Sequence, residues 1–147
     1  MGFQTDCVHA GQWPDEKTGA VITPVFQTST YKQDGIGKHR GYEYARTANP
    51  TREALERNVA VLEKGKFGIA YSSGMAATDT ILRLFGAGDE IVVTDNVYGG
   101  TYRLFELVLK QLGYIFKFVD TSDLKQVEAA LSPKTKLVFL ESPTNPM

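Results

Sequence analysis

The sequence lacks the features that a secreted or membrane-spanning protein would need. Cys7 is its only cysteine, so no disulfide can form within the chain, and a reducing compartment such as the cytoplasm is expected. Residues 1–6 have neither the basic start nor the apolar run of a signal peptide. The longest apolar runs, at 91–93 and 137–140, are far too short to span a bilayer. We therefore expect a soluble cytoplasmic protein with no membrane partner.

A surplus of positive charge is also missing. The chain has 16 basic and 17 acidic residues and a formal charge of -1. Basic residues gather loosely only at Lys32, Lys38, His39 and Arg40, where Asp34 dilutes them. A nucleic-acid-binding domain usually carries a basic stripe or a high net positive charge. We interpret this stretch as an exposed loop and expect no nucleic-acid partner.

The first 49 residues contain little regular patterning but many turn-forming residues. Turns are indicated at 18–19, 23–24 and 34–35. The same stretch also carries large apolar and aromatic side chains, among them Val25, Phe26 and Tyr31. These side chains are too apolar for a freely solvated tail, so residues 1–49 are predicted to be an ordered arm. The arm packs either on its own body or on a partner subunit.

From Asn49 onward, helices and strands alternate. Asn49 can cap a helix, Pro50 suits its first turn, and Gly65 can end it. The pattern then predicts a strand at 67–71, a helix ending at Gly86, a strand at 90–94, a helix at 100–112, a strand at 114–119, a helix at 123–131 capped by Ser122 or Thr121, and a strand at 136–140. This order predicts an α/β fold with a mostly parallel sheet, formed by residues 50–147. Because such a sheet seldom ends on an uncovered strand, the chain is expected to be truncated.

Ligands bind beyond the carboxyl ends of parallel strands, and a glycine-containing turn lies at one of them. Residues 72–75 (SSGM) lead from a strand into a helix, whose first amides carry a partial positive charge and suit a phosphate. An ordinary serine-capped turn fits the residues equally well. Neither the Walker motif nor the Gly-x-Gly-x-x-Gly dinucleotide motif is present, which argues against a nucleotide-binding domain. No metal site is expected.

Two further segments lie at strand ends. Tyr98 precedes two glycines and a helix, so its ring could stack on a flat heteroaromatic ligand, or simply cover the end of the sheet. Prolines at 143 and 146 stiffen the loop that holds Glu141 and Asn145. That loop could contact a ligand or be a rigid turn. Together with the phosphate turn, these segments suit a flat phosphorylated cofactor.

Four blocks of the sequence resemble the Cys/Met-metabolism family of pyridoxal 5'-phosphate (PLP) enzymes. The family includes cystathionine γ-synthase, γ-lyase and β-lyase and methionine γ-lyase. The blocks follow in the family's order: YARTANPT at 44–51, SSGMAA at 72–77, VYGGT at 97–101 and ESPTNP at 141–146. The resemblance implies the three-layer fold of aspartate aminotransferase, a homotetramer built from two tight dimers, and PLP as cofactor.

The resemblance also implies roles for particular residues. Ser73, Gly74 and Met75 would hold the PLP phosphate, the latter two through backbone amides. Tyr98 would stack on the pyridine ring and act in catalysis, and Asn145 would contact the ring's phenolic oxygen. Across the dimer interface, Tyr44 and Arg46 would grip the phosphate of the neighbouring subunit, a task that suits a guanidinium.

The Schiff-base lysine, the aspartate that pairs with the pyridine nitrogen and the arginine that binds the substrate carboxylate lie further along the family's chains. This chain is therefore expected to be an N-terminal part that is inactive alone. For its parent, the resemblance favours transsulfuration at the γ carbon of sulfur amino acids or activated homoserine. Cystathionine β-lyase and methionine γ-lyase remain alternatives. From another class, a non-catalytic piece acting only in dimerisation also remains open.

Overall fold

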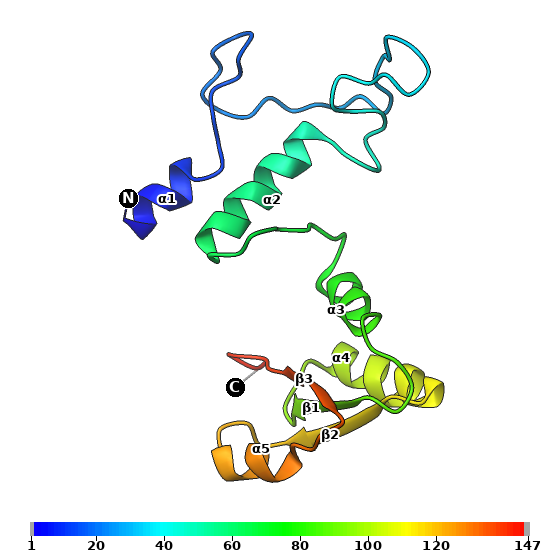
Figure 1. Cartoon of the computed structure of the whole chain (residues 1–147). Coiled ribbons are helices and arrows are strands. Elements are labelled where there is room, and N and C mark those ends of the chain that lie inside the picture. Colours follow the sequence, from blue (N-terminus) through cyan, green and yellow to red (C-terminus); the bar gives the residue numbers. More distant parts are fainter. Residues whose placement is uncertain (1, 146–147) are drawn as a thin grey trace. The chain divides into compact units, whose positions relative to one another are not determined.

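The computed structural model describes residues 2–145 and divides into two compact units, Met1–Ala70 and Tyr71–Met147. The first unit contains α1 (Phe3–His9) and α2 (Pro50–Leu62). The second contains α3 (Gly74–Leu82), β1 (Glu90–Thr94), α4 (Gly99–Arg103), a π-helical turn (Leu104–Val108), a 3₁₀ turn (Leu109–Leu112), β2 (Ile115–Val119), α5 (Leu124–Ala130) and β3 (Thr135–Phe139) (Figure 1).

Helix α2 begins as the sequence predicts. The Asn49 side chain accepts a hydrogen bond from the Thr51 amide at 2.9 Å, and Pro50 occupies the first turn. The helix ends in a Schellman-type turn, in which the Gly65 amide donates to the Ala60 carbonyl at 2.7 Å. The left-handed residue of this turn is Lys64, with φ of 54°, rather than the expected glycine.

The N-terminal segment is ordered against α2. Asn49 Nδ2 donates to the Phe26 carbonyl at 3.0 Å, and the Phe26 amide donates to Thr51 Oγ1 at 2.9 Å. Helix α1, which the sequence pattern did not reveal, is joined to α2 by Asn58 Nδ2, which donates to the Ala10 carbonyl at 2.7 Å. Part of the arm thus packs on its own unit. Whether residues 1–49 also reach a neighbouring subunit stays a prediction, as does the boundary at residue 50.

The strand predicted at 67–71 is wrong. These residues belong to no helix or strand and pair with no strand in the described chain. The Ala70 amide instead donates to Glu56 Oε1 at 2.9 Å, and Gly68 lies directly against the α2 backbone. A Cβ on Gly68 would stand 2.2 Å from the Glu56 carbonyl oxygen. A helix therefore takes the place of the expected neighbouring strand.

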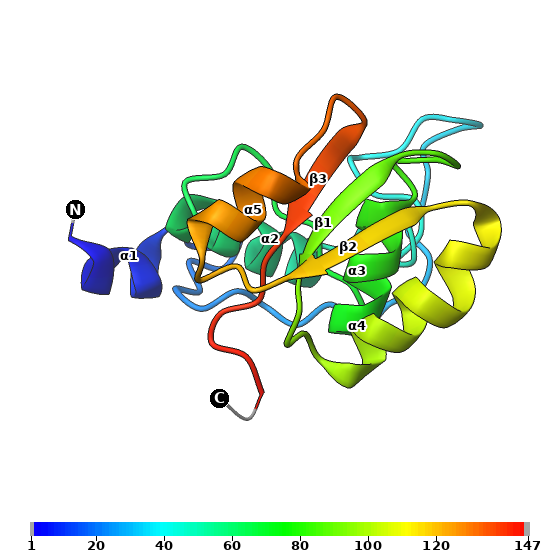
Figure 2. The ribbon, with the colours of Figure 1, turned by 90° about the horizontal axis from the view of Figure 1, so that it is seen from below.

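The second unit is built on a parallel three-stranded sheet in the order β2-β1-β3. The central strand aligns Ile91 with Phe116 of β2 and with Leu137 of β3. Helices α3 and α4 lie on one side of this sheet and α5 on the other (Figure 1, Figure 2). The strands expected at 90–94, 114–119 and 136–140 are confirmed to within one residue. This arrangement confirms the predicted α/β class.

The core of this unit lies between the sheet and the α3 and α4 helices. Phe105 is fully buried, stacks on Phe116 with ring centroids 4.5 Å apart and meets Phe139 edge-on at 5.4 Å. The Tyr114 hydroxyl donates to the Phe85 carbonyl at 2.7 Å, which fixes the segment after α3. Helix α5 is capped by Asp123, which accepts from the Lys125 amide, rather than by the two expected residues before it.

Candidate functional site

Helix α3 opens toward solvent at its first turn. Ser73 Oγ accepts a hydrogen bond from the Ala76 amide at 3.1 Å and so caps the helix. The amides of Gly74 and Met75 lie in the same turn, where backbone N–H groups have no partner within the helix. A Cβ added to Gly74 would meet nothing within 4 Å. Free amides, a positive helix end and open space in front of them suit a phosphate group.

Tyr98, at the start of α4, comes close to this turn. Its ring leaves no room for a side chain at Gly100, because a Cβ there would stand 2.4 Å from Tyr98 Cε1 and 3.2 Å from Met75 Sδ. The Thr101 hydroxyl lies 3.8 Å from the same sulfur. The Tyr98 side chain is about half exposed. Gly100 thus allows the ring to lie beside Met75 while one part of it stays open to a ligand.

The loop after β3 is tied to the loop after β1. Glu141 Oε2 accepts a hydrogen bond from the Tyr98 amide at 2.8 Å, and Asn96 Nδ2 donates to Thr144 Oγ1 at 3.0 Å. Two strand ends therefore hold the backbone of Tyr98 in place. The sequence predicted a stiff loop at 141–146 but gave no sign of this contact.

These residues line one open hollow of about 390 Å³. Its walls are Ser73, Gly74, Met75, Thr78, Tyr98, Thr101, Phe139 and Glu141. Four of the predicted site residues, those at 73, 74, 75 and 98, are thus brought together. Asn145 is exposed and is not among the lining residues, so its role stays a prediction. Thr101 belongs to the VYGGT block but was assigned no role, while Thr78 and Phe139 have no distinguishing sequence signal, since each is an ordinary residue of a helix or strand.

A second hollow, of about 640 Å³, lies at the carboxyl ends of all three strands and shares Glu141 with the first. Asp95 and Asp120 also line it. Hydrogen bonds from the side chain and backbone of Ser122 hold the pKa of Asp120 below its ordinary value. Carboxylates that stay charged repel a phosphate. The helix end at Gly74 is therefore the better of the two places for one.

Tyr44 and Arg46 lie in the first unit. Tyr44 forms an antiparallel bridge with Thr30, and the Arg46 guanidinium lies over the Tyr44 ring, 5.0 Å from its centroid. The two side chains therefore meet, as the resemblance leads one to expect of residues that act together. Their relation to a phosphate stays a prediction.

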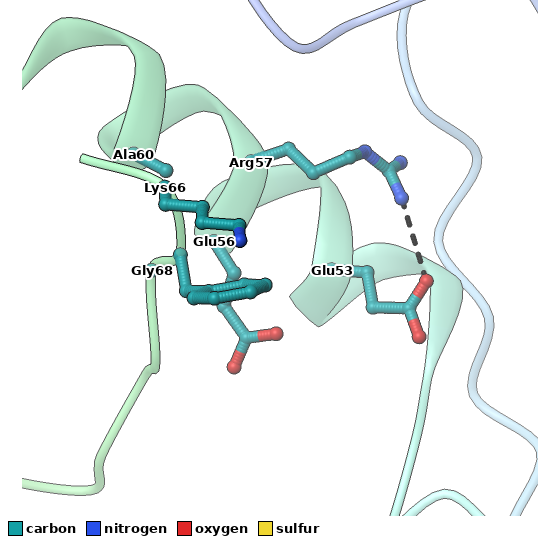
Figure 3. A pocket seen from close by; sticks show the side chains of 7 residues that line it. Glu53, Glu56, Arg57, Ala60, Lys66 and Gly68 are labelled. Carbon is teal, nitrogen blue, oxygen red and sulfur yellow. Dashed lines mark hydrogen bonds and ion pairs between the residues drawn. The ribbon is translucent and has the colours of Figure 1, made fainter. Parts of the chain in front are cut away.

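A smaller hollow of about 230 Å³ borders α2 in the first unit (Figure 3). An ion pair between Glu53 and Arg57, 3.4 Å long, lies on one side, while the Glu56 carboxylate points away from it. Lys66 Nζ lies 5.4 Å from the centroid of the Phe67 ring. None of the predicted site residues lines this hollow, so we do not consider it the active site.

Between residues 2 and 145, no three histidine, cysteine or acidic side chains come together as metal ligands would. Within the same range, no helix combines the length and the apolar character needed to cross a membrane.

The hollow beside α3 fits PLP. The amides of Gly74 and Met75 can receive the phosphate, and the half-exposed Tyr98 ring offers a face for the pyridine. The open space in front of Gly74 leaves a phosphate free to approach the backbone. Among residues 2–145, however, no lysine lines the hollow to bind the cofactor covalently.

Comparisons with known proteins agree with this geometry. The family described as Cys/Met metabolism PLP-dependent enzyme matches residues 4–147. A probable cystathionine γ-synthase of Herpetosiphon aurantiacus is 51% identical over 99% of this chain and 46% of its own length. A cystathionine β-lyase of Coxiella burnetii is 56% identical over 98% of this chain and 38% of its own.

Among solved structures, the cystathionine γ-lyase from Lactobacillus plantarum, complexed with L-serine, superposes with a TM-score of 0.91 at 51% identity. The match covers 99% of this chain and 38% of the γ-lyase chain. The chain thus spans less than half the length of these relatives. The resemblance found in the sequence is confirmed: the chain belongs to the Cys/Met-metabolism family of PLP-dependent enzymes.

Proposed function

We propose that this chain is the N-terminal part of a PLP-dependent transsulfuration enzyme, and that it forms the cofactor-binding part of the active site. The observation that supports this most directly is the hollow in which Ser73, Gly74, Met75 and Tyr98 meet. In the proposed enzyme the substrate is either a sulfur amino acid or an activated homoserine, and the reaction takes place at its γ carbon. A γ-synthase and a γ-lyase, each 51% identical, support this choice.

Each residue of the hollow has a role in this proposal. Ser73 caps α3, and the Gly74 and Met75 amides donate to the phosphate. Tyr98 would offer its ring face to the pyridine, and Asn145 would contact the ring's phenolic oxygen. PLP, when bound, serves as an electron sink for the reacting carbon. The chain's own residues would hold the phosphate and the ring in one position in the hollow.

We further propose that residues 1–49 form an arm of a homodimer or homotetramer, in which Tyr44 and Arg46 bind the phosphate in the neighbouring subunit. The contact between their side chains supports joint action. An Arg46 guanidinium can donate two parallel hydrogen bonds to phosphate oxygens. In a mixed dimer, Arg46→Ala should therefore weaken PLP binding in the partner's site and leave its own subunit's site intact. Loss confined to its own site would contradict the shared arrangement.

Gly74→Ala tests the phosphate site, in protein made from its own gene at its natural length. The added methyl group enters open space, so folding is unaffected, and alanine favours the helix. The same methyl group stands in front of the amides that receive the phosphate. We expect the apo protein to unfold at the same temperature or higher, and PLP to bind at least about tenfold more weakly, a loss of about 1.4 kcal/mol.

Gly86→Ala is the matched control. A Cβ there also meets nothing within 4 Å, but Gly86 lies outside the hollow. PLP affinity should therefore not change. If Gly74→Ala binds PLP as tightly as the unchanged protein, the phosphate is not held at α3 and the proposed site is wrong.

A β-lyase is the second candidate, because the Coxiella relative is 56% identical to this chain. Cystathionine separates the two. Cleavage of its C–S bond on the γ side, with uptake of water, releases cysteine, 2-oxobutyrate and ammonia, while cleavage on the β side releases homocysteine, pyruvate and ammonia. For a γ-lyase we expect cysteine from the protein of natural length incubated with PLP and cystathionine, and for a γ-synthase we expect cystathionine from cysteine and an acylated homoserine, with release of the acyl group as its acid. Homocysteine would identify a β-lyase, and neither PLP binding nor cleavage would favour a non-catalytic dimerisation piece.

A further inference from the structure

One arginine of α2 bonds to the turn that carries Tyr44 and Arg46. Arg52 Nη1 donates to the carbonyl of Ala45 at 3.2 Å and to that of Arg46 at 3.4 Å, and Nη2 donates to the Thr47 carbonyl at 2.6 Å. Three consecutive carbonyls thus share one guanidinium. Its planar, forked set of N–H donors can serve several acceptors in fixed directions, which a lysine ammonium cannot do to the same extent.

The turn itself closes on Tyr44. The Tyr44 carbonyl accepts from the amides of Thr47 and Ala48, each at 3.0 Å, and from the Thr47 hydroxyl at 2.8 Å. The backbone from 44 to 48 is therefore a single bonded loop with Arg52 on its carbonyl side. The Arg46 guanidinium lies over the Tyr44 ring because this loop brings the two side chains together.

Arg52 is held in turn by Glu56, one helical turn further along. Arg52 Nε lies 3.4 Å from Glu56 Oε1, and the two side chains are only 33% and 19% exposed. The same Oε1 accepts from the Ala70 amide at 2.9 Å. In Figure 3 the Glu56 carboxylate stands apart from the Arg57–Glu53 pair on the same helix. The Glu56 carboxylate thus contacts Arg52 and the amide of Ala70, which lies three residues before Ser73.

We propose that Arg52, oriented by Glu56, is a positioning residue for phosphate binding by Tyr44 and Arg46. It contacts no cofactor itself. It fixes the carbonyls of residues 45–47 so that the two side chains are presented together, already ordered, to the phosphate. The entropy cost of ordering these side chains arises when the chain folds and not when the cofactor binds, so the affinity for PLP is higher. This inference rests on the proposed function of Tyr44 and Arg46.

Arg52→Lys tests the proposal in protein of natural length, because it keeps the charge and the helix but loses the fork. We expect the dissociation constant of PLP to rise about tenfold, because the turn must then be ordered when the cofactor binds rather than when the chain folds. In the apo protein, amide hydrogens of Thr47 and Ala48 should exchange faster by a similar factor, about tenfold, while those of Ala10 and Glu63, elsewhere in the same unit, are unchanged. A purely structural role would raise exchange across the whole unit and leave the affinity of the folded protein unaltered.

Arg57→Lys is the matched control, because it is the same change on the same helix, in an arginine that also pairs with a glutamate one helical turn away. It should leave PLP affinity unchanged. Glu56→Gln provides a second test should Arg52→Lys not fold, since glutamine still accepts from Ala70 but holds Arg52 less firmly. It should shift both measurements in the same direction, by less.

The outcomes separate the two proposals. If Arg46→Ala weakens PLP binding but Arg52→Lys and Glu56→Gln do not, the positioning role is wrong and the proposed function stands. If Arg46→Ala also leaves PLP binding unchanged, the phosphate role of the arm is wrong. Weaker binding by Arg52→Lys, with faster exchange confined to residues 44–48, supports the inference.

Discussion

The backbone amide of Tyr98 donates a 2.8 Å hydrogen bond to the carboxylate of Glu141, 43 residues further along the chain. The bond joins the loop after the central strand β1 to the loop after the edge strand β3. Tyr98 begins α4 and has no side-chain cap of its own. Glu141 therefore fixes the point from which both the helix and the Tyr98 ring project, although the two residues are far apart in the sequence.

Removing this acceptor should loosen the Tyr98 loop. We expect Glu141→Ala to lower the free energy of unfolding by about 0.5–1.5 kcal/mol, the net contribution of a hydrogen bond whose donor water can reach after the change. Glu141→Gln keeps an oxygen that can accept the bond and should lose less than half as much. Urea unfolding of the two variants measures the difference. Equal losses would show that the negative charge matters rather than the acceptor.

Gly100 should be required for the position of the Tyr98 ring. A Cβ at residue 100 would stand 2.4 Å from the ring, so in Gly100→Ala the ring must move. We expect PLP to bind at least about tenfold more weakly, equal to about 1.4 kcal/mol. Absorbance titration with PLP measures the change.

Gly99→Ala is the control for this prediction. A Cβ there meets only the end of the Arg103 side chain, at 3.5 Å, which is an ordinary contact. Its PLP affinity should match that of the unchanged protein. Should Gly100→Ala also bind PLP normally, the ring's position is not important for the cofactor.

An ion-pair network makes stability depend on pH in the acid range. Lys117 Nζ and the Ser132 hydroxyl each lie 2.6 Å from Glu90 Oε2, and both donate to it. These bonds, that of Lys117 first, hold the pKa of Glu90 below its ordinary value of 4.5. The stabilisation is therefore fully present above that value and is lost as the pH falls through the lowered pKa of the folded state.

Unfolding curves between pH 7 and pH 3 test this. The unchanged protein should lose more stability over this range than Glu90→Gln, which is less stable at neutral pH but has no carboxylate to protonate. The difference between the two proteins should shrink as the pH falls. A constant difference would mean that Glu90 contributes through packing and not through its charge.

Much of the second unit was predictable because its signals are local. The run of aliphatic residues at 91–93 predicted a strand buried on both faces, and β1 is the central strand. Gly113, with φ of 90°, ends the helical stretch as expected. The segment 67–71 has the same apolar character as β1, yet it forms no strand, since its Ala70 amide bonds to Glu56 of α2 and the side chains of Phe67 and Ile69 are exposed. Such a choice between helix and strand partners depends on tertiary contacts that a local pattern does not contain.

The site was predictable to the same degree. Short motifs identified Ser73, Gly74, Met75 and Tyr98, although only Tyr98 follows a strand of the sheet, since the strand expected before Ser73 is absent among the described residues. The contacts that support these side chains were not recognised, and Glu141 was named only as part of a stiff loop. Glu141 and Arg52 act through backbone groups of other residues. Because every residue has these backbone groups, the residue type of the partner gives no sign of the bond in the sequence.

The end of α2 offers a test of backbone strain. Lys64 is the only non-glycine residue among 2–145 with a positive φ, and a side chain in this conformation crowds the following carbonyl. Glycine removes that crowding, although it also gains freedom in the unfolded chain. We expect Lys64→Gly to raise the free energy of unfolding by about 0.5–1 kcal/mol. Lys64→Ala removes the same long side chain but keeps the Cβ, so it should bring no gain. If both variants stabilise the protein equally, the benefit comes from losing the lysine's charge or length, and the left-handed conformation of residue 64 is not under strain.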